Sequence, residues 1–172
     1  MPLVQDMSKA QIAFQVTGQP VDKFDVVRYR GNEGLCQLYR FEIDLVAVGS
    51  PLALDTLVGK TATLSVNTET GERWFHGLVS RAEITGESVG QTYYRAELVP
   101  NVWLLNQRYH SRIFQNKTTK EIISAVLTEG GIASDHVKFM LQGSYTSREY
   151  CVQYRETDYN FIARLMEEEG IW

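Results

Sequence analysis

The chain has 172 residues, of which 44% are hydrophobic and 22% charged, so it has the balance of an ordinary globular protein and room for one domain or two small ones. Its net charge is −4, from 17 Lys plus Arg against 21 Asp plus Glu, and it has no basic run, which argues against nucleic-acid binding. No stretch approaches the roughly 18–20 apolar residues of a spanning helix, and the first 14 residues lack the basic start and apolar core of a signal peptide.

The first hundred residues predict a set of short β-strands, because apolar and polar residues alternate there with a period of two. The clearest run is Tyr39–Val48, whose charged face could meet solvent, a lumen or a neighbouring subunit. About six or seven strands at this short spacing are typical of a small sandwich or barrel. The runs expected to form strands are the one containing Ile12, Phe14 and Val16, then Phe24–Arg30, Tyr39–Val48, Lys60–Asn67, Arg73–Thr85 and Thr92–Val99.

Segments that contain glycine predict the turns between these strands. Gly31–Gly34 is expected to end the second run, Glu69–Glu72 to close a hairpin, and Gly86–Gly90 to form another turn. Gly77 lies inside a strand and predicts a bend or a bulge. Leu52–Val58 follows a strand-breaking Ser-Pro pair and predicts a short helix or an irregular lid.

The alternation stops at Pro100, and residues 100–108 predict a short helical crossover into a second unit. Thr118 and Glu121 then have the spacing of a capping box, in which each side chain bonds a free backbone N–H at the start of a helix. Gly130–Gly131 is expected to end this helix. The apolar stripe between these signals consists of Ile122, Ile123, Val126 and Leu127.

The last part of the chain predicts two strands and a second helix. Val137–Leu141 is expected to form a strand and Gln142–Ser147 a turn. In Tyr150–Arg155, Tyr and Val alternate with Cys, Gln and Arg, as in a half-buried strand. Thr157 or Asp158 can cap the following helix, because a short side-chain oxygen accepts a bond from a free first-turn N–H. The apolar stripe of that helix is Phe161, Ile162, Leu165 and Met166.

Together these elements predict an α+β fold that is mostly β. A small antiparallel β-barrel is expected over residues 1–104, and an α+β unit in the order helix–strand–strand–helix over residues 105–172.

Glu167, Glu168 and Glu169 are the first candidates for chemistry, because paired carboxylates can serve as general acid and base. Consecutive helical residues point in directions roughly 100° apart, and Arg164 can pair with Glu168, so a solvated helix end is favoured. Carboxylates at a helix C-terminus oppose the macrodipole at a cost of about 0.3–1 kcal/mol each. We therefore expect a basic partner for them, on this chain or on another. Gly170 is expected to be the left-handed stop of the helix.

The histidines and cysteines form no recognisable site. His76, His110 and His136 are widely spaced and lie in no metal-binding pattern, so structural or surface roles are favoured over a metal site. Cys36 and Cys151 belong to no Cys/His cluster, and we interpret them as reduced, partly buried thiols of a cytosolic protein. A disulfide between them would need Cα atoms within roughly 7 Å of each other, which the sequence does not establish.

No nucleophile elbow, phosphate loop or dinucleotide-binding glycine motif occurs, so we assign no catalytic, cofactor-binding or metal-binding residue and expect no cofactor. The nine Tyr, seven Phe and three Trp occur without clustered Lys and Arg. This indicates that the aromatic side chains lie in the core and in interfaces rather than stack on nucleic-acid bases. The candidates for an interface are Tyr93, Tyr94, Trp103 and Tyr109.

Two stretches carry a family pattern. Gln153–Asp158 reads Q-Y-R-E-T-D, and it is followed by the helical pair Phe161-Ile162 and by E-E-E-G-I at Glu167–Ile171. The string LVPNVWLLNQRYHSRIFQNKTTKEIISAVL fits P-x-x-W-x-L-x-x-R, then R-I-F-Q, then T-x-x-E-I-I-x-x-[VI]-L. From about Phe24 onward the sequence therefore resembles the N-terminal hub region of the VgrG spike proteins of type VI secretion. It is similar in the same region to the phage tail-hub proteins of the late control D type.

The resemblance implies a structural, non-enzymatic role in a contractile injection machine. The expected assembly is a homotrimer whose barrels form a ring on a hexameric, Hcp-like tube protein, with baseplate proteins, a spike tip and effectors as further partners. Residues 1–104 would be the tube domain and residues 105–172 a baseplate-like domain that is incomplete at Trp172. The target membrane would be reached only through the missing spike. Nucleic acid and small-molecule substrates are not expected.

The resemblance further implies assembly in the bacterial cytoplasm and export by the machine without a signal peptide. A phage or prophage tail baseplate hub is the alternative within the same class. Two alternatives of other classes remain: a carboxylate-based hydrolase that uses Glu167–Glu169, and a ligand-binding barrel.

Overall fold

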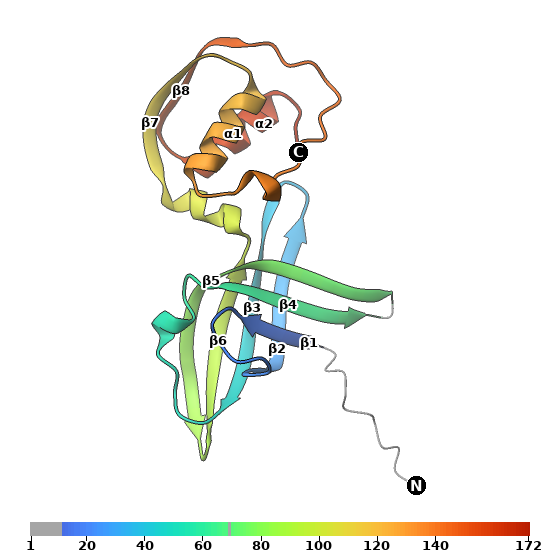
Figure 1. The fold of residues 1–172 in the computed structure, drawn as a ribbon, viewed down its shortest axis with the longest axis vertical. Helices are drawn as coiled ribbons and strands as arrows, with labels where there is room; N and C mark the ends of the chain where they lie inside the picture. The colour runs from blue at the N-terminus through green and yellow to red at the C-terminus, as the bar shows by residue number, and fades with distance from the viewer. Residues whose placement is uncertain (1–11, 69) are drawn as a thin grey trace. The chain divides into compact units, whose positions relative to one another are not determined.

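The computed structural model describes residues 12–68 and 70–172, and they divide into two compact units (Figure 1). The first unit contains the described residues up to Gly34 together with Tyr39–Pro100. The second contains Leu35–Leu38 and Asn101–Trp172. The predicted mostly β composition with added helices is confirmed. The sequence interpretation of the first residues, including the expectation that they form no signal peptide, concerns residues 1–11, which lie outside the described residues.

The first unit is one curled antiparallel sheet of six strands with the order β1-β4-β5-β6-β3-β2. Its edge strands β1 and β2 contact each other because the sheet bends round on itself as a half-barrel (Figure 1). A short 3-10 helix, η1 (Leu54–Thr56), occupies the predicted helix or lid. The strands are β1 (Ile12–Val16), β2 (Asp25–Gly34), β3 (Gln37–Val48), β4 (Thr61–Thr68), β5 (Gly71–Ser88) and β6 (Gln91–Val99).

The alternation predicted for β3 is confirmed and fixes the core of the first unit. Phe41, Ile43 and Leu45 are buried in the hydrophobic core of the first unit. On the opposite face Asp44 pairs with Arg28 at 2.5 Å on β2 and with Arg95 at 2.8 Å on β6. The hydrogen bond from Arg95, with that from Arg28, holds the pKa of Asp44 below its ordinary value. The wet face of β3 is therefore lined by ion pairs of this chain.

Two predicted turns lie elsewhere in the structure. Gly31–Gly34 continues β2, and the β2–β3 turn is at Leu35–Cys36. Gly86 belongs to β5, whose turn to β6 is at Val89–Gly90. The glycines in both segments predicted that the strands would end there. In the structure, pairing with a neighbouring strand outweighs the weak strand preference of glycine. The β4–β5 hairpin is confirmed by the pair Thr68 and Gly71, although Glu69 in its predicted turn lies outside the described residues.

Gly77 is needed for close backbone approach, and the bulge predicted there is wrong. It pairs in register with Ala62, while the register of β5 with β6 shifts at Ser80 and at Thr85. A Cβ on Gly77 would clash with the carbonyl oxygen of Val99 and would lie 2.8 Å from its carbonyl carbon. Glycine at this position lets β5 cross the end of β6 without a side chain between the two backbones.

The second unit is a two-stranded antiparallel sheet with both α-helices packed on it. The core lies between the helices and the sheet, where the rings of Phe114 and Phe161 stack at 5.8 Å. No helix among the described residues is long and apolar enough to cross a membrane. The elements are η2 (Asn101–Gln107), β7 (Tyr109–Lys117), α1 (Thr119–Glu129), η3 (Ser134–His136), β8 (Arg148–Thr157) and α2 (Asp158–Glu168).

The crossover over residues 100–108 is confirmed as η2, but the predicted order of the elements after it is wrong. The observed order is strand–helix–strand–helix, because β7 was not predicted and Val137–Leu141 is not a strand. The inward face of β7 carries His110, Arg112 and Phe114, so polar groups take positions where a strand pattern requires apolar ones. In 137–141 the side chains alternate, but the described chain offers this segment no partner strand.

The helix signals are confirmed. Thr118 and Glu121 form the capping box of α1, and the four residues of its apolar stripe are buried. Thr157, not Asp158, caps α2, because its hydroxyl accepts the N–H of Asn160 at 3.0 Å. Gly170 has a φ of +66°, the left-handed stop that follows α2.

Replacement of Gly77 by alanine should destabilise the first unit by about 1–3 kcal/mol, because the added methyl group overpacks the crossing of β5 and β6. Gly86→Ala on the same strand is the matched control, since a Cβ there meets nothing within 4 Å. Urea unfolding of both variants measures the effect. Equal midpoints for the two variants would contradict the close approach at Gly77.

Candidate functional site

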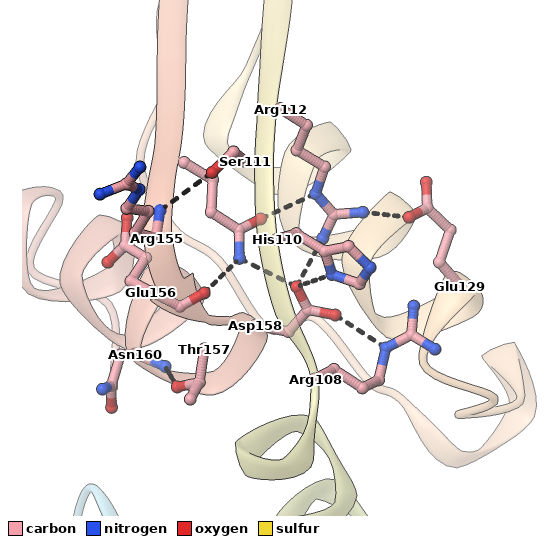
Figure 2. Close-up of polar contacts among 11 residues, drawn as sticks. Arg108, His110, Ser111, Arg112, Glu129, Arg155, Glu156, Thr157, Asp158 and Asn160 are labelled. Carbon is pink, nitrogen blue, oxygen red and sulfur yellow. Dashed lines mark hydrogen bonds and ion pairs between the residues drawn. The ribbon is translucent and has the colours of Figure 1, made fainter.

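The most connected polar group of the second unit is Asp158, the first residue of α2, which is 0% exposed (Figure 2). Its donors come from the residue before β7, from β7 itself and from β8. All four donor atoms lie 2.9 Å from a carboxylate oxygen: Arg108 Nε from Oδ2, and His110 Nδ1, Arg112 Nη2 and Gln153 Nε2 from Oδ1.

A second layer of bonds holds these donors in place (Figure 2). The side chain of Gln153 accepts a bond from Arg112 Nε at 2.7 Å and donates to the Glu156 carbonyl at 3.1 Å. Arg112 also pairs with Glu129 on α1, and the backbone N–H of Asp158 donates to the Arg108 carbonyl at 2.9 Å. The cluster around Asp158 therefore ties β7, β8, α1 and α2 together.

A bulge in β8 helps to form the Asp158 cluster. The register shifts between His110 and Arg112, where Tyr154 and Arg155 on β8 lie opposite the single residue Ser111 on β7. Arg155 has a φ of +50°, and its N–H donates to the Ser111 hydroxyl at 3.2 Å. The extra residue bends the strand, and β8 then runs directly into the cap of α2.

The electrostatics keep Asp158 ionised. Burial acts to raise the pKa of this carboxyl, but the hydrogen bonds from Arg108, Gln153 and His110, with the charge of Arg112, outweigh burial and hold the pKa below its ordinary value. An ionised carboxylate without solvent access has no proton to give and no room for a substrate. The cluster can fix the positions of strands and helices, and it offers no site for catalysis.

Two of the three carboxylates at the end of α2, Glu168 and Glu169, have basic partners on this chain. Arg148 lies 2.7 Å from Glu168 and 2.7 Å from Glu169, and Arg164 lies 3.1 Å from Glu168. The predicted pair of Arg164 and Glu168 is thus confirmed, and the hydrogen bond from Arg148 lowers the pKa of Glu168. Glu167 is exposed and makes no ion pair among the described residues. Glu168 and Glu169 are therefore held in ion pairs with arginine rather than left as free carboxylates.

The histidines lie in unrelated settings. His76 is exposed and stacks on Trp74 at 6.2 Å, with Nδ1 2.9 Å from the Thr63 hydroxyl. His110 belongs to the Asp158 cluster, and His136 is exposed in η3. Within residues 12–68 and 70–172, no group of three or more His, Cys, Asp or Glu residues could hold a metal ion.

The two cysteines are free thiols in the structure. Cys151 is buried as predicted, and its burial raises the pKa of the thiol. Cys36 is exposed in the β2–β3 turn, so the prediction of partial burial is wrong there.

The four aromatic candidates for an interface differ in how exposed they are in the structure. Tyr94 is 1% exposed, packs edge-on against Phe24 at 5.8 Å, and accepts the N–H of Leu52 at 2.8 Å. It is a core residue, and its assignment to an interface is wrong. Tyr93 is 37% exposed and Tyr109 is 70% exposed, while Trp103 is half-buried, so an interface role for these three stays a prediction.

The sequence did not indicate that the residues of the Asp158 cluster meet, although most of them lie in a motif quoted above. Arg108 ends the pattern P-x-x-W-x-L-x-x-R, and Arg112 begins R-I-F-Q. Gln153 and Asp158 are the first and last residues of Q-Y-R-E-T-D. Motifs that are distant along the chain therefore meet at one buried carboxylate.

Comparison with known proteins gives the family. Residues 32–172 match the model of the phage tail baseplate hub (GPD). The chain belongs to the phage tail baseplate hub family. The Asp158 cluster lies entirely within the matched part of this hub chain.

Among curated proteins, the hub chain is 42% identical over 146 residues to the type VI secretion system spike protein VgrG4b of Pseudomonas aeruginosa, a match that covers 85% of this chain and 18% of the relative. It is 33% identical over 176 residues to the spike protein VgrG3 of Vibrio cholerae, covering 96% of this chain and 17% of the relative. The hub chain thus spans about a fifth of the length of these relatives.

Two solved structures share the fold of the hub chain. The first is the Escherichia coli c3393 protein, a type VI secretion system component described as similar to the T4 bacteriophage tail proteins gp27 and gp5. It has a TM-score of 0.78 and 24% identity, and the match covers 91% of this chain and 43% of that one. The second is the 43 kDa tail protein of prophage MuSo2 from Shewanella oneidensis. It has a TM-score of 0.62 and 14% identity, and the match covers 92% and 50%.

Replacement of Asp158 by asparagine should lower the free energy of unfolding by about 3 kcal/mol, because Arg108 and Arg112 lose their counter-charge in a mostly buried site. Urea unfolding at neutral pH measures the loss. Asp135→Asn, a change at an exposed residue of η3, is the control and should stay within about 0.5 kcal/mol of the wild type.

The pH dependence of this difference follows from the lowered pKa of Asp158. The stability that the ionised form contributes is complete above the unfolded pKa of about 3.9, and it is lost as the pH falls through the lower pKa of the folded state. The advantage of the wild type over Asp158→Asn should therefore be constant near neutral pH and shrink below about pH 4. An advantage that grows on acidification would contradict the assignment.

Charge reversal at Glu169 should cost about 1 kcal/mol, because it places a second cation beside Arg148. The adjacent Glu167→Lys is the matched control and should have an effect below about 0.5 kcal/mol. Thermal unfolding compares the two variants. Equal losses would show that the ion pairs of Arg148 contribute nothing to stability.

Proposed function

We propose that this chain forms the N-terminal hub part of the spike of a type VI secretion system, as a structural component of a contractile injection machine. The observation that carries the proposal is the 42% identity to a type VI secretion spike protein over 85% of the chain. The shared fold of the E. coli secretion component supports it.

In this role the chain acts by packing, and its partners are proteins. We assign the curled sheet of the first unit to a tube domain and the second unit to a baseplate-like domain. Three copies form a ring that docks on a tube protein, with baseplate proteins, a spike tip and effectors as further partners. The ring assembles in the bacterial cytoplasm, and the machine exports it.

The proposed role includes no enzymatic activity of this chain. Asp158 is inaccessible, and Glu168 and Glu169 are paired with Arg148 and Arg164, so the geometry gives no support to the carboxylate hydrolase considered above. One relative, from Vibrio cholerae, is named an actin cross-linking toxin. The match covers 16% of that protein, and we do not extend its activity to this chain.

A hub in a phage or prophage tail is the second candidate. The family model and the fold of the Shewanella prophage tail protein favour it. At 14% identity that likeness concerns the fold alone, whereas several relatives near 40% identity are secretion spike proteins. The identities therefore favour the secretion system.

The proposal predicts that the bacterium that produces this chain stops releasing its tube protein into the medium when the chain is deleted. Immunoblotting of the medium measures the release. Complementation with the wild type or with Glu167→Lys should restore release, whereas Asp158→Asn should restore less, because its second unit is destabilised. Undiminished release after deletion would overturn the secretion role, and a loss of phage particles instead would favour the tail hub.

A further inference from the structure

Among the described residues, no element covers the outer face of the β7–β8 sheet, which carries large aromatic and aliphatic side chains. The helices α1 and α2 pack on the inner face, where Phe114 and Cys151 are buried. The outer side chains form what we name the tyrosine face. Its members are Tyr109 (70% exposed), Ile113 (56%), Tyr150 (56%), Val152 (39%) and Tyr154 (65%).

The chemistry of the tyrosine face is that of an interface core. Ile113 lies directly opposite Val152 in the register, and the other outward positions of β7 between Tyr109 and Lys117 are Ser111 and Gln115, which carry no charge. Two cations border the tyrosine face: Arg155 lies over the Tyr154 ring at 5.3 Å, and Arg164 Nη2 donates to the Val152 carbonyl at 3.3 Å. Exposed tyrosine with little charge distinguishes the centre of a protein interface from ordinary surface.

The size and rigidity of the tyrosine face suit docking. Five side chains of this exposure present on the order of 500 Å², a large part of the roughly 800 Å² that each partner gives to a standard interface. The Asp158 cluster fixes both strands from behind through Arg112 and Gln153. A surface that is already ordered loses little conformational entropy when it binds.

We propose that the tyrosine face is a contact between neighbouring copies of this chain in the assembled hub, an inference that rests on the proposed function. Every copy carries the same net charge of −4, so copies repel least where they present uncharged groups. The hydroxyls of the tyrosines and of Ser111, and the amide of Gln115, can each donate and accept. In a three-fold ring the contact joins unlike surfaces, so the tyrosine face meets a different surface of the next copy.

Photo-crosslinking in the producing bacterium tests which molecule covers the tyrosine face. A benzophenone amino acid in place of Tyr154 should give products that contain only this chain, at two and three times its mass. A product with a different protein, or no product, overturns the proposal. Tube-protein release, measured in the same cells, tests the proposed function separately. If release still depends on the chain while Tyr154 crosslinks to another protein, the docking inference alone fails.

Sedimentation of the purified protein provides the second test. Exchange of both Tyr154 and Ile113 for serine should weaken self-association at least about tenfold, because two exposed anchors of the contact are lost. Met140→Ser, which removes a 77% exposed apolar side chain outside the tyrosine face, is the matched control and should associate like the wild type. Circular dichroism verifies that the variants are folded. Undiminished association of the double variant, or a wild type that stays monomeric, overturns the proposal.

Discussion

A sheet with one apolar face has to keep that face from water, and each unit of this chain does so differently. In the first unit the strands curl until the edges β1 and β2 contact each other, so the sheet covers its own core around Ile43 and Leu45. In the second unit two strands are too few to do this. Two helices cover the inner face instead, and the bonds of Asp158 fix them to it.

The parts that the sequence predicts are those in which neighbours along the chain share one environment. In β3 every second residue is apolar, and both the strand and its buried face were correctly predicted. The capping box at Thr118 and Glu121 gives the start of α1 because its two partners are three residues apart. The strand β7 was missed because its inward positions include His110 and Arg112, whose partner Asp158 is more than forty residues away.

The candidate site could not be predicted for the same reason. Nothing near Arg108 in the sequence indicates that its guanidinium neutralises a carboxylate on another element. The carboxylates at the end of α2 were considered as possible catalysts because the sequence does not show their pairing with Arg148, which lies twenty residues earlier. The family motifs contained most of these residues without giving their roles. Only the pairing of β7 with β8, a long-range event, brings them together.

The position of the Asp158 cluster also affects how the second unit would resist a pulling force on its ends. The chain enters the β7–β8 pair at Tyr109 and leaves it at Thr157, and these two residues lie opposite each other. Tension on these adjacent ends would open the ladder one pair at a time from that side. The first bonds to bear the force join Arg108 and Asp158, which lie just outside Tyr109 and Thr157. A pull on the two ends of this pair of strands would therefore meet the bonds between Arg108 and Asp158 first.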